Sequence, residues 1–570
     1  MNIPLANLTT PNPNTAASLL PPTSAFPPTN YTETFQLASP LTLPLTNPIC
    51  TTTLGWHAFK SSYGNPWVTK HFVVPPNCGT SWSTIVLTLQ SSAKGRQFDR
   101  IYQVWVNGFE LLRGCTNEPT RDGVWWEIRK DVTDLSPVFQ RSTSGGGGMT
   151  VTVALDNVND DVYTGVYNTS VSFEFYSMVQ TGFGKNSVPD MAVALESKEL
   201  YPHIVLDGTG KAASFKVPLL PRNILRAELE YYVSYHQSDE FYYVNGPDDS
   251  YASPENGIFG GGTYKELQVY IDDIQVGVEA PFQLVYTGAN DPKLWKPISP
   301  IRSEDFPSYR FDLTPFASVL ANGKEHTITL NVTTQTKKSL WFVDGILRLW
   351  LDDSGAPVTG TVMETSFENI EPTVQVVKHE NGIDFAASTS VVKKSLVRGQ
   401  VGDWITSISK RIEFDGFVNY TQEGKSVTGW HNIATSTFWN VTSVITGVVR
   451  GWGFTVSTYP MTFNFTQIPM STNGSLYYSY TLYDHAQNVN TFLSMTGRGS
   501  SSNTMERHIA EGFVSNLQTL PHSWWNNDSH IASYSSVVLN DDGCVSYGRN
   551  VQTVNGTIIS DKVQESKPSK

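Results

Sequence analysis

The strongest constraint on the fold of this chain is a repeated alternation of apolar and polar residues within short segments. Examples are residues 84–89, 102–106, 149–155 and 171–176, which Gly, Pro, Asn and Asp separate from their neighbours. Alternation with a period of two is typical of half-buried strands, and long runs of helical period are scarce here. The pattern therefore predicts an all-β fold built of sandwiches.

An internal repeat refines this prediction. A strand-like segment, an Asp-x-Thr turn and a second strand-like segment occur twice in the same order, and such a turn can begin a short helix through its side-chain oxygens. The two copies are residues 102–106, Asp131-Val-Thr133 and 151–155, then residues 267–271, Asp312-Leu-Thr314 and 326–332. We interpret them as two related β-sandwiches, with chance similarity between two β domains as the alternative.

The length of 570 residues is too great for a single core. We expect a Pro/Thr-rich N-terminal arm at 1–48, a first sandwich at 49–185 and a second at 186–352. Strand-like segments continue through 353–570, which we interpret as a C-terminal β domain with a polar tail.

The charge and hydropathy of the chain limit its partners. The net charge of −13 repels phosphate backbones, so we expect no nucleic acid partner. No run approaches 18 consecutive apolar residues, so we expect no membrane span. We expect a monomer, with residues 353–400 as the region where cleavage into two chains would fall.

Several features bear on the compartment. The start, residues 1–5, lacks the basic and apolar regions of a signal peptide, which taken alone favours the cytosol. Charged residues are only 16% of the chain, and Asn-x-Ser/Thr sequons are frequent, although about seven would arise by chance. We therefore expect a secreted or vacuolar, lysosome-like location, with the signal peptide not present in this chain. The sequons begin at Asn7, Asn30, Asn168, Asn331, Asn419, Asn440, Asn464, Asn473, Asn527 and Asn555.

The four cysteines are Cys50, Cys78, Cys115 and Cys544. They permit two disulfides in three connectivities. Because the sequence contains no Cys-x-x-Cys motif and no Cys/His cluster, we expect no metal site.

Two segments are dense in polar groups amid apolar strands. The first, 95–133, contains Asp99 and Arg100 at the start of a strand, where an exposed ion pair worth ~0–1 kcal/mol is the alternative interpretation. The second, 231–245, places His236 and Glu240 between two aromatic runs.

Carboxylates beside a wall of Tyr and Phe have raised pKa values that suit acid–base work, although the second segment can equally be a polar hairpin turn. Two carboxylates from two domains can hydrolyse a glycosidic bond or an amide, and the residues alone do not choose between these reactions. The sequence contains no Gly-x-Ser-x-Gly nucleophile motif.

Eight motifs in order resemble the peptide-N-glycanase A family of plants and fungi, as a fungal-type member. The resemblance is strong over 49–352 and looser in the C-terminal region. The motifs are Gly95-Arg-Gln-Phe-Asp-Arg100, Val104-Trp-Val-Asn-Gly-Phe-Glu-Leu-Leu-Arg113, Thr116-Asn-Glu-Pro119, Lys130-Asp-Val-Thr133, Tyr201-Pro-His203, Tyr232-Val-Ser-Tyr-His236, Asp239-Glu-Phe-Tyr-Tyr-Val-Asn245 and Leu313-Thr-Pro-Phe316.

The resemblance implies hydrolysis of the amide between Asn and the first N-acetylglucosamine of an N-glycan, leaving Asp and a glycosylamine. It implies N-linked glycopeptides and glycoproteins as partners, no cofactor, and two adjacent jelly-roll-like sandwiches with a cleft between them. An N-glycan-binding protein without activity and a glycoside hydrolase using the same carboxylates are the alternatives.

Site residues follow from the same resemblance. Asp99 matches the catalytic Asp that bacterial enzymes of this chemistry hold before Arg, and Glu240 is the nearest match to their essential Glu. Arg100 is expected to orient Asp99 or bind a sugar hydroxyl, with a plain ion pair as the alternative, and His236 is expected to bind substrate. Asp156, a third carboxylate candidate, is expected to bind substrate, with a solvated Asp at a strand end as the alternative. Trp295 is expected to stack on the chitobiose core, with core packing as the alternative.

The resemblance also bears on the cysteines. Cys50 and Cys78 match a pair that occurs in the family, which leaves Cys115 to pair with Cys544, or both of these as free thiols. Residues 113–119 read Arg-Gly-Cys-Thr-Asn-Glu-Pro, where plant members have a sequence close to Arg-Thr-Ser-Thr-Ala-Glu-Pro.

Overall fold

The prediction of an all-β fold is confirmed, because strands dominate the chain and only two short α-helices occur among the described residues. Among these residues no helix is long and apolar enough to cross a membrane. The computed structural model describes residues 26–44, 46–143, 148–177, 188–197, 199–254, 257–289, 292–333, 339–469, 476–495, 501–519, 529–539 and 545–565.

The first sandwich packs a five-stranded sheet, in the order β1-β7-β4-β9-β2, on a four-stranded sheet, in the order β3-β8-β5-β6. Both sheets contribute to one buried core, to which Leu87 and Val104 belong. The elements are β1 Thr32–Glu33, β2 Cys50–Phe59, β3 Trp67–Phe72, η1 Pro76–Cys78, β4 Trp82–Lys94, β5 Ile101–Val106, β6 Phe109–Cys115, β7 Val124–Asp131, η2 Thr133–Leu135, α1 Ser136–Thr143, β8 Met149–Leu155 and β9 Val166–Ser177.

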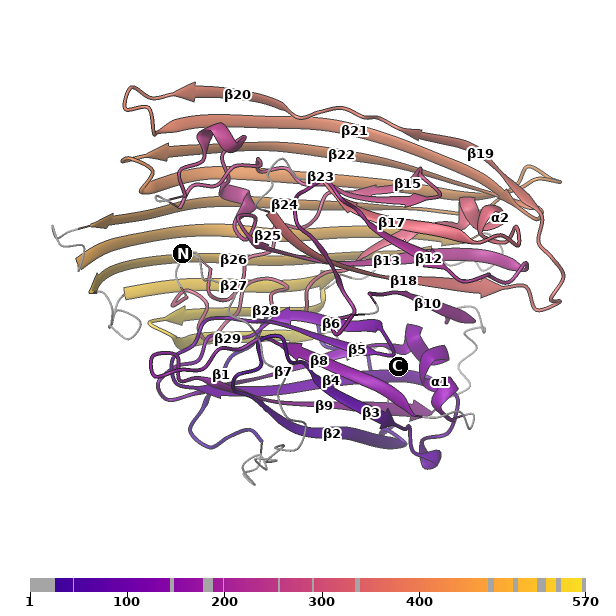
Figure 1. Ribbon diagram of the computed structural model, residues 1–570, viewed down its shortest axis with the longest axis horizontal. Coiled ribbons are helices and arrows are strands. Elements are labelled where there is room, and N and C mark those ends of the chain that lie inside the picture. The colour runs from indigo at the N-terminus through magenta and orange to yellow at the C-terminus, as the bar shows by residue number, and fades with distance from the viewer. Residues whose placement is uncertain are drawn as a thin grey trace, which may run out of the picture.

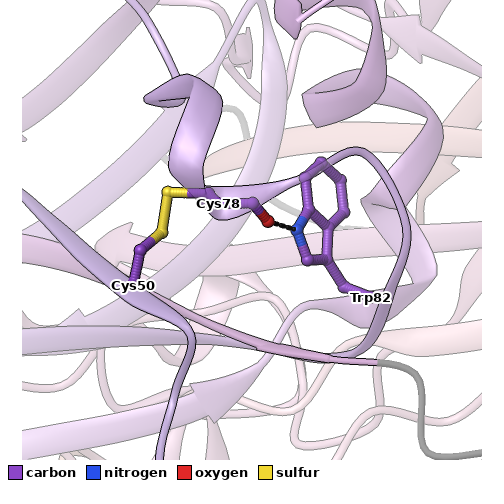
Figure 2. The surroundings of a disulfide bond; sticks show 3 residues. All are labelled: Cys50, Cys78 and Trp82. Atoms are coloured by element: carbon purple, nitrogen blue, oxygen red, sulfur yellow. Dashed lines mark hydrogen bonds between the residues drawn. A yellow bond between two sulfur atoms is a disulfide. The ribbon is translucent and has the colours of Figure 1, made fainter.

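A disulfide joins β2 to the turn η1, as Figure 2 shows. It links Cys50 to Cys78, and the Trp82 indole N–H donates to the Cys78 carbonyl oxygen at 2.7 Å. The pair that the family resemblance implied is thereby confirmed.

The second sandwich has one sheet in the order β16-β13-β18-β10, with β11 also pairing β18, and another in the order β12-β17-β14-β15. Apolar side chains alternate toward its core, as in β12, where Ala213, Phe215 and Val217 are buried and the residues between them are exposed. The elements are β10 Met191–Leu195, β11 Ile204–Leu206, β12 Ala213–Val217, β13 Ile224–Gln237, η3 Tyr242–Val244, η4 Asp249–Tyr251, β14 Leu267–Ile271, β15 Ile274–Glu279, β16 Tyr309–Asp312, η6 Thr314–Phe316, α2 Ala317–Leu320, β17 His326–Val332 and β18 Ser339–Leu351.

The two sandwiches have the same strand order. The order β7-β4-β9-β2 corresponds to β16-β13-β18-β10, and β3-β8-β5-β6 corresponds to β12-β17-β14-β15. In both Asp-x-Thr turns the Asp carboxylate accepts the Thr backbone N–H, at 2.8 Å for Asp131 and 2.9 Å for Asp312, and a 3-10 turn and a short helix follow. The internal repeat in the sequence therefore corresponds to a repeat in the fold.

The C-terminal region forms one large antiparallel sheet, which Figure 1 shows in orange to yellow as a broad layer. Its buried face shares a continuous core with the second sandwich; Phe414 packs against Tyr264, and His485 stacks on Phe282. The strands are β19 Gly360–Phe367, β20 Thr373–Lys378, β21 Phe385–Val401, β22 Trp404–Thr421, β23 Ser426–Ser443, β24 Val449–Pro469, β25 Leu476–Met495, β26 Ser501–Thr519, β27 Ser529–Leu539, β28 Val545–Val554 and β29 Thr557–Glu565.

A buried ionic cluster joins the two sandwiches. Arg113 on β6 makes a two-pronged ion pair with Glu110, at 2.7 and 2.6 Å, and neither side chain is exposed. Its remaining amino group reaches the second sandwich, donating to the Ser234 hydroxyl at 3.0 Å and to the Phe342 carbonyl at 2.6 Å. This cluster holds β6 against β13 and β18, directly beneath the pocket described next.

Candidate active site

A pocket of about 290 Å³ opens between the two sandwiches. It brings together Asp99, Arg100, Asp156, His236 and Glu240, five of the six residues that the sequence predicted for catalysis or substrate binding. The first sandwich contributes Tyr63, Asp99, Arg100, Ile101, Gln103, Ala154 and Asp156, and the second contributes Tyr201, His203, His236, Gln237, Glu240, Tyr286, Leu340 and Phe342.

Asp99 lies in the loop between β4 and β5 and is partly buried. Its Oδ2 accepts two hydrogen bonds, from the Gly288 backbone N–H at 3.0 Å and from the Cys115 thiol at 3.2 Å. Burial raises the pKa of Asp99, and these two donors together with the charge of Arg100 offset part of that rise. The carboxylate is therefore held in one orientation and remains ionisable.

Glu240 lies in the turn that follows β13, where its backbone N–H donates to the Gln237 carbonyl at 3.0 Å. Burial, and then the negative charge of Asp99, raises the pKa of Glu240 to about 7. No described residue hydrogen-bonds to its carboxyl group, which leaves that group available to a substrate or water. The charge of Asp99 therefore contributes to the raised pKa of Glu240, and raised pKa values of this kind suit acid–base work.

The repeat in the fold explains why these two carboxyls meet. Asp99 follows β4 and Glu240 follows β13, which are equivalent strands of the two sandwiches. Cys115 ends β6, and Gly288 follows β15, which are again equivalent strands. Corresponding connections of the two repeats therefore converge on one pocket.

The pocket walls carry polar groups held in fixed orientations. Asp156, at the end of β8, accepts the Tyr201 hydroxyl at 2.6 Å, and burial raises its pKa. His203 stacks on Phe342 with ring centroids 4.3 Å apart, and the His236 ring packs on the same phenyl group at 4.1 Å.

Both histidines are uncharged at neutral pH. Burial, and then the charge of Arg113, lowers the pKa of His236 to about 3 and the pKa of His203 well below its usual value. His236 Nε2 lies 3.0 Å from the Ser234 hydroxyl, which also accepts from Arg113. His236 therefore acts as a neutral hydrogen-bonding group.

Several lining residues were not predicted to belong to the site. Tyr63, Gln103, Tyr286 and Phe342 lie on separate strands and loops, and their local sequence resembles that of any half-buried strand. Glu118, which lies in the Thr116-Asn-Glu-Pro119 motif, was not predicted as a site residue. Its carboxyl lies near that of Asp99, since a Cβ placed on Gly288 would contact both. Tyr201 and His203 also line the pocket, and the Tyr201-Pro-His203 motif was the sequence signal that could have placed them there.

Trp295 lies outside this pocket. It is 2% exposed, its indole N–H donates to the Ala289 carbonyl at 2.9 Å, and its ring packs edge-on against Tyr483 of the C-terminal sheet. The expectation that Trp295 stacks on sugar is therefore wrong, and the alternative of core packing applies, because the C-terminal sheet covers this side chain.

Cys115 is a free, fully buried thiol. The disulfide that the resemblance implied between Cys115 and Cys544 is therefore wrong. The Cys115 sulfur faces the predicted catalytic Asp99 and the Thr287 hydroxyl, 3.4 Å away, so it is enclosed within the interface between the sandwiches. Cys544 lies outside the described residues.

A larger groove of about 430 Å³ crosses the C-terminal sheet. Its lining includes Lys394, Arg411 and Glu368 beside the rings of Phe438 and Phe454. The smaller pocket differs from this groove in containing Asp99 and Glu240, two electrostatically coupled carboxyls.

Comparison by sequence agrees with the predicted resemblance. A protein from Prunus dulcis, "peptide-N4-(N-acetyl-beta-glucosaminyl)asparagine amidase A", is 28% identical over 579 residues, covering 94% of this chain and 93% of that protein. Among solved structures, PNGF-II matches with a TM-score of 0.36 and 14% identity, over 53% of this chain and 66% of that one.

A second solved structure, a peptide-N(4)-(N-acetyl-beta-D-glucosaminyl) asparagine amidase, matches with a TM-score of 0.34 and 12% identity, over 53% of this chain and 96% of that one. The model of the family "Peptide N-acetyl-beta-D-glucosaminyl asparaginase amidase A" matches residues 40–368, more than half of the 570-residue chain. This chain therefore belongs to the peptide N-acetyl-beta-D-glucosaminyl asparaginase amidase A family.

Proposed function

We propose that this protein hydrolyses the amide that joins Asn to the first N-acetylglucosamine of N-linked glycopeptides and glycoproteins, leaving Asp and a glycosylamine. The observation that carries the proposal is the pair of carboxyls in one pocket, in which the charge of Asp99 helps to raise the pKa of Glu240 to about 7. Family membership supports the same reaction.

Amide hydrolysis requires a base for the attacking water and an acid for the leaving nitrogen. In our proposal, Asp99 takes a proton from water while the oxygen of that water forms a bond to the amide carbon. The C–N bond then breaks, and the leaving nitrogen takes a proton from the carboxyl of Glu240. Water thus supplies the second oxygen of the new Asp carboxyl group. At the end of the cycle, one proton passes through solvent from Asp99 to Glu240.

The other pocket residues fit roles in substrate binding. Arg100 offers a guanidinium beside Asp99 and stabilises its ionised form. Asp156 and Tyr201 form a hydrogen-bonded pair whose remaining lone pairs can accept sugar hydroxyls. The neutral His236 can donate to or accept from an acetamido group of N-acetylglucosamine without adding charge to the pocket.

We also propose an oxidising, extracytosolic compartment such as the secretory space or a vacuole. The Cys50–Cys78 disulfide supports this location, because structural disulfides persist in oxidising compartments.

A mass spectrum of a treated glycopeptide tests the reaction. Amidase action leaves Asp in place of the glycosylated Asn and releases the intact glycan. A glycoside hydrolase would leave one N-acetylglucosamine on Asn, and a glycan-binding protein without activity would leave the glycopeptide unchanged. Either of these two products would overturn the proposal.

Glu240→Gln is expected to lower kcat about 10²-fold near pH 6, because glutamine cannot give up a proton. The wild-type kcat should also fall as the pH rises through about 7, where Glu240 loses its proton, and the variant should lack this alkaline limb. Steady-state release of glycan measured from pH 4 to 9 checks both results. An alkaline limb that persists in the variant would assign it to another group.

Thermal unfolding provides the control for this variant. The folded-state pKa of Glu240 lies above its ordinary value of 4.5, so its ionisation opposes folding, and the stability present at low pH is lost as the pH rises through about 7. Glutamine removes this loss, on the order of 1–3 kcal/mol. The unfolding midpoint of the variant relative to wild type should therefore be higher at pH 8 than at pH 5.

A further inference from the structure

Both sandwiches supply a hydrogen-bond donor to the same oxygen of Asp99. The Cys115 thiol comes from the end of β6 in the first sandwich, and the Gly288 N–H comes from the connection after β15 in the second. Their distances to Asp99 Oδ2 are 3.2 and 3.0 Å. The orientation of Asp99 is thus fixed at the interface between the repeats.

The geometry points to a two-donor clamp, in which Cys115 and Gly288 are positioning residues that fix Asp99 Oδ2 and leave Oδ1 to take the proton from water. This inference rests on the proposed function. It assigns a role to Cys115 that differs from both a disulfide partner and a nucleophile.

The Cys115 side chain is a thiol in this environment. Burial, and then the negative charge of Asp99, raises its pKa well above the usual value, and the side chain is 0% exposed. A nucleophilic cysteine works as the thiolate, which this setting disfavours. The Thr287 hydroxyl already donates to the Thr116 carbonyl. The acceptors within reach of the sulfur proton are therefore Asp99 at 3.2 Å, the Thr287 hydroxyl at 3.4 Å and the Thr116 carbonyl at 3.7 Å. The ionised acceptor makes the stronger bond.

Gly288 is required by the close approach of its backbone to Asp99. A Cβ at this position would lie 2.3 Å from Asp99 Oδ1 and 2.6 Å from Asp99 Cγ. It would also lie 2.8 Å from Glu118 Oε1. The φ of Gly288 is not positive, so alanine can adopt its backbone conformation. The obstacle to an alanine side chain is the Asp99 carboxylate.

Other ionisable groups also face Asp99. Arg100 favours its ionised form, the carboxyl of Glu118 lies nearby, and the charge of Asp99 raises the pKa of Glu240. The Tyr167 hydroxyl on β9 donates to the Phe98 carbonyl, and burial keeps it neutral by raising its pKa. These groups are unchanged in variants of Cys115, so a shift in the ionisation of Asp99 between such variants reports the thiol.

The test compares Cys115→Ala, Cys115→Ser and Gly288→Ala with wild type. Loss of a donor raises the pKa of Asp99, so Cys115→Ala should move the acid limb of the kcat profile to higher pH and lower kcat at pH 5 about tenfold, with KM unchanged. Cys115→Ser retains a donor and should return kcat to within about twofold of wild type with the acid limb restored. Gly288→Ala should lower kcat about 10²-fold by displacing the carboxylate.

Gly548→Ala on β28 is the matched control, because a Cβ there would meet its nearest neighbour at 3.4 Å, an ordinary contact far from the pocket. Its kcat should equal that of wild type. An acid limb that does not move in Cys115→Ala would overturn the clamp. Equal inactivation of the alanine and serine variants would also overturn it, because that result indicates a nucleophilic sulfur.

A measurement without substrate separates this inference from the proposed function. The folded-state pKa of Asp99 is raised, so its stabilising contribution is lost as the pH rises through that pKa. Removal of the thiol donor increases this loss of stability. Between pH 4 and pH 7, the midpoint of thermal unfolding should therefore fall further in Cys115→Ala than in Cys115→Ser. A pH-independent difference would reflect the cavity alone and overturn the clamp. If wild type releases no glycan while this pH-dependent difference appears, the proposed function fails and the clamp stands.

Discussion

Asp99→Asn is expected to lower kcat for glycan release by at least about 10³-fold, with little change in KM. The asparagine amide has nearly the same shape as the carboxylate but cannot accept a proton from water. The variant retains the pocket walls, so binding of the glycan through other residues continues. Initial rates with a fluorescent N-glycopeptide, over a tenfold range around KM, give both constants.

The stability of this variant should be equal to or higher than that of wild type. Burial raises the pKa of Asp99, so its ionisation costs folding free energy at neutral pH, and asparagine removes that cost. Asp161→Asn is the matched control, because Asp161 is exposed and does not line the pocket, and it should leave kcat unchanged. If Asp99→Asn retains more than a tenth of the wild-type kcat, the site assignment fails although family membership stands.

The fold was largely predictable from local pattern. Alternating segments such as 171–176 became strands, because Val171, Phe173 and Phe175 face the core while the residues between them are partly exposed. The repeat of Asp-x-Thr turns predicted the duplication of the sandwich. The sharing of one core between the second sandwich and the C-terminal sheet could not be predicted, since packing between distant strands depends on which faces meet in space.

The proposed catalytic pair, Asp99 and Glu240, could not be recognised from local sequence alone. Taken alone, Asp99 reads as a strand-end ion pair and Glu240 as part of a hairpin turn. Their shared pocket depends on equivalent loops of two repeats about 140 residues apart in sequence meeting at one interface. The raised pKa of Glu240 likewise depends on that meeting, because the charge of Asp99 is one of its causes.

The errors about Cys115 and Trp295 have the same physical origin. Each residue has a plausible exposed or paired role in the sequence, and each is enclosed by a segment distant in the chain. Thr287 lies against the Cys115 sulfur, and the C-terminal sheet covers Trp295. Burial of this kind is a property of tertiary packing, which residue spacing does not encode.

The buried ionic cluster around Arg113 stabilises the interface between the sandwiches only while its charges remain paired. Asp344 lies in the same buried interface, where its carboxyl accepts the Trp105 indole N–H at 2.7 Å. Burial, and then the charge of Glu110, raises the pKa of Asp344 well above its usual value. Arg113 is the cation that makes burial of Glu110 tolerable. Its removal leaves a buried charge without a partner.

Arg113→Met is therefore expected to destabilise the protein by about 3–5 kcal/mol and to lower the midpoint of thermal unfolding by roughly 2–4 °C. Methionine fills much of the volume, so the loss reports the stranded Glu110 and the lost bonds to Ser234 and Phe342. Calorimetric scans at pH 7 measure it.

Two comparisons make this expectation specific to the buried charge. Arg411→Met removes an ion pair with Glu413 whose side chains are 43% and 41% exposed, and it should cost only ~0–1 kcal/mol. The double variant Arg113→Met/Glu110→Gln removes the stranded carboxylate and should recover part of the lost stability, because a neutral amide costs less to bury than an unpaired charge. If the double variant is no more stable than Arg113→Met, the unpaired charge is not the cause of the loss, and the packing of the arginine stem between the two repeats accounts for it instead.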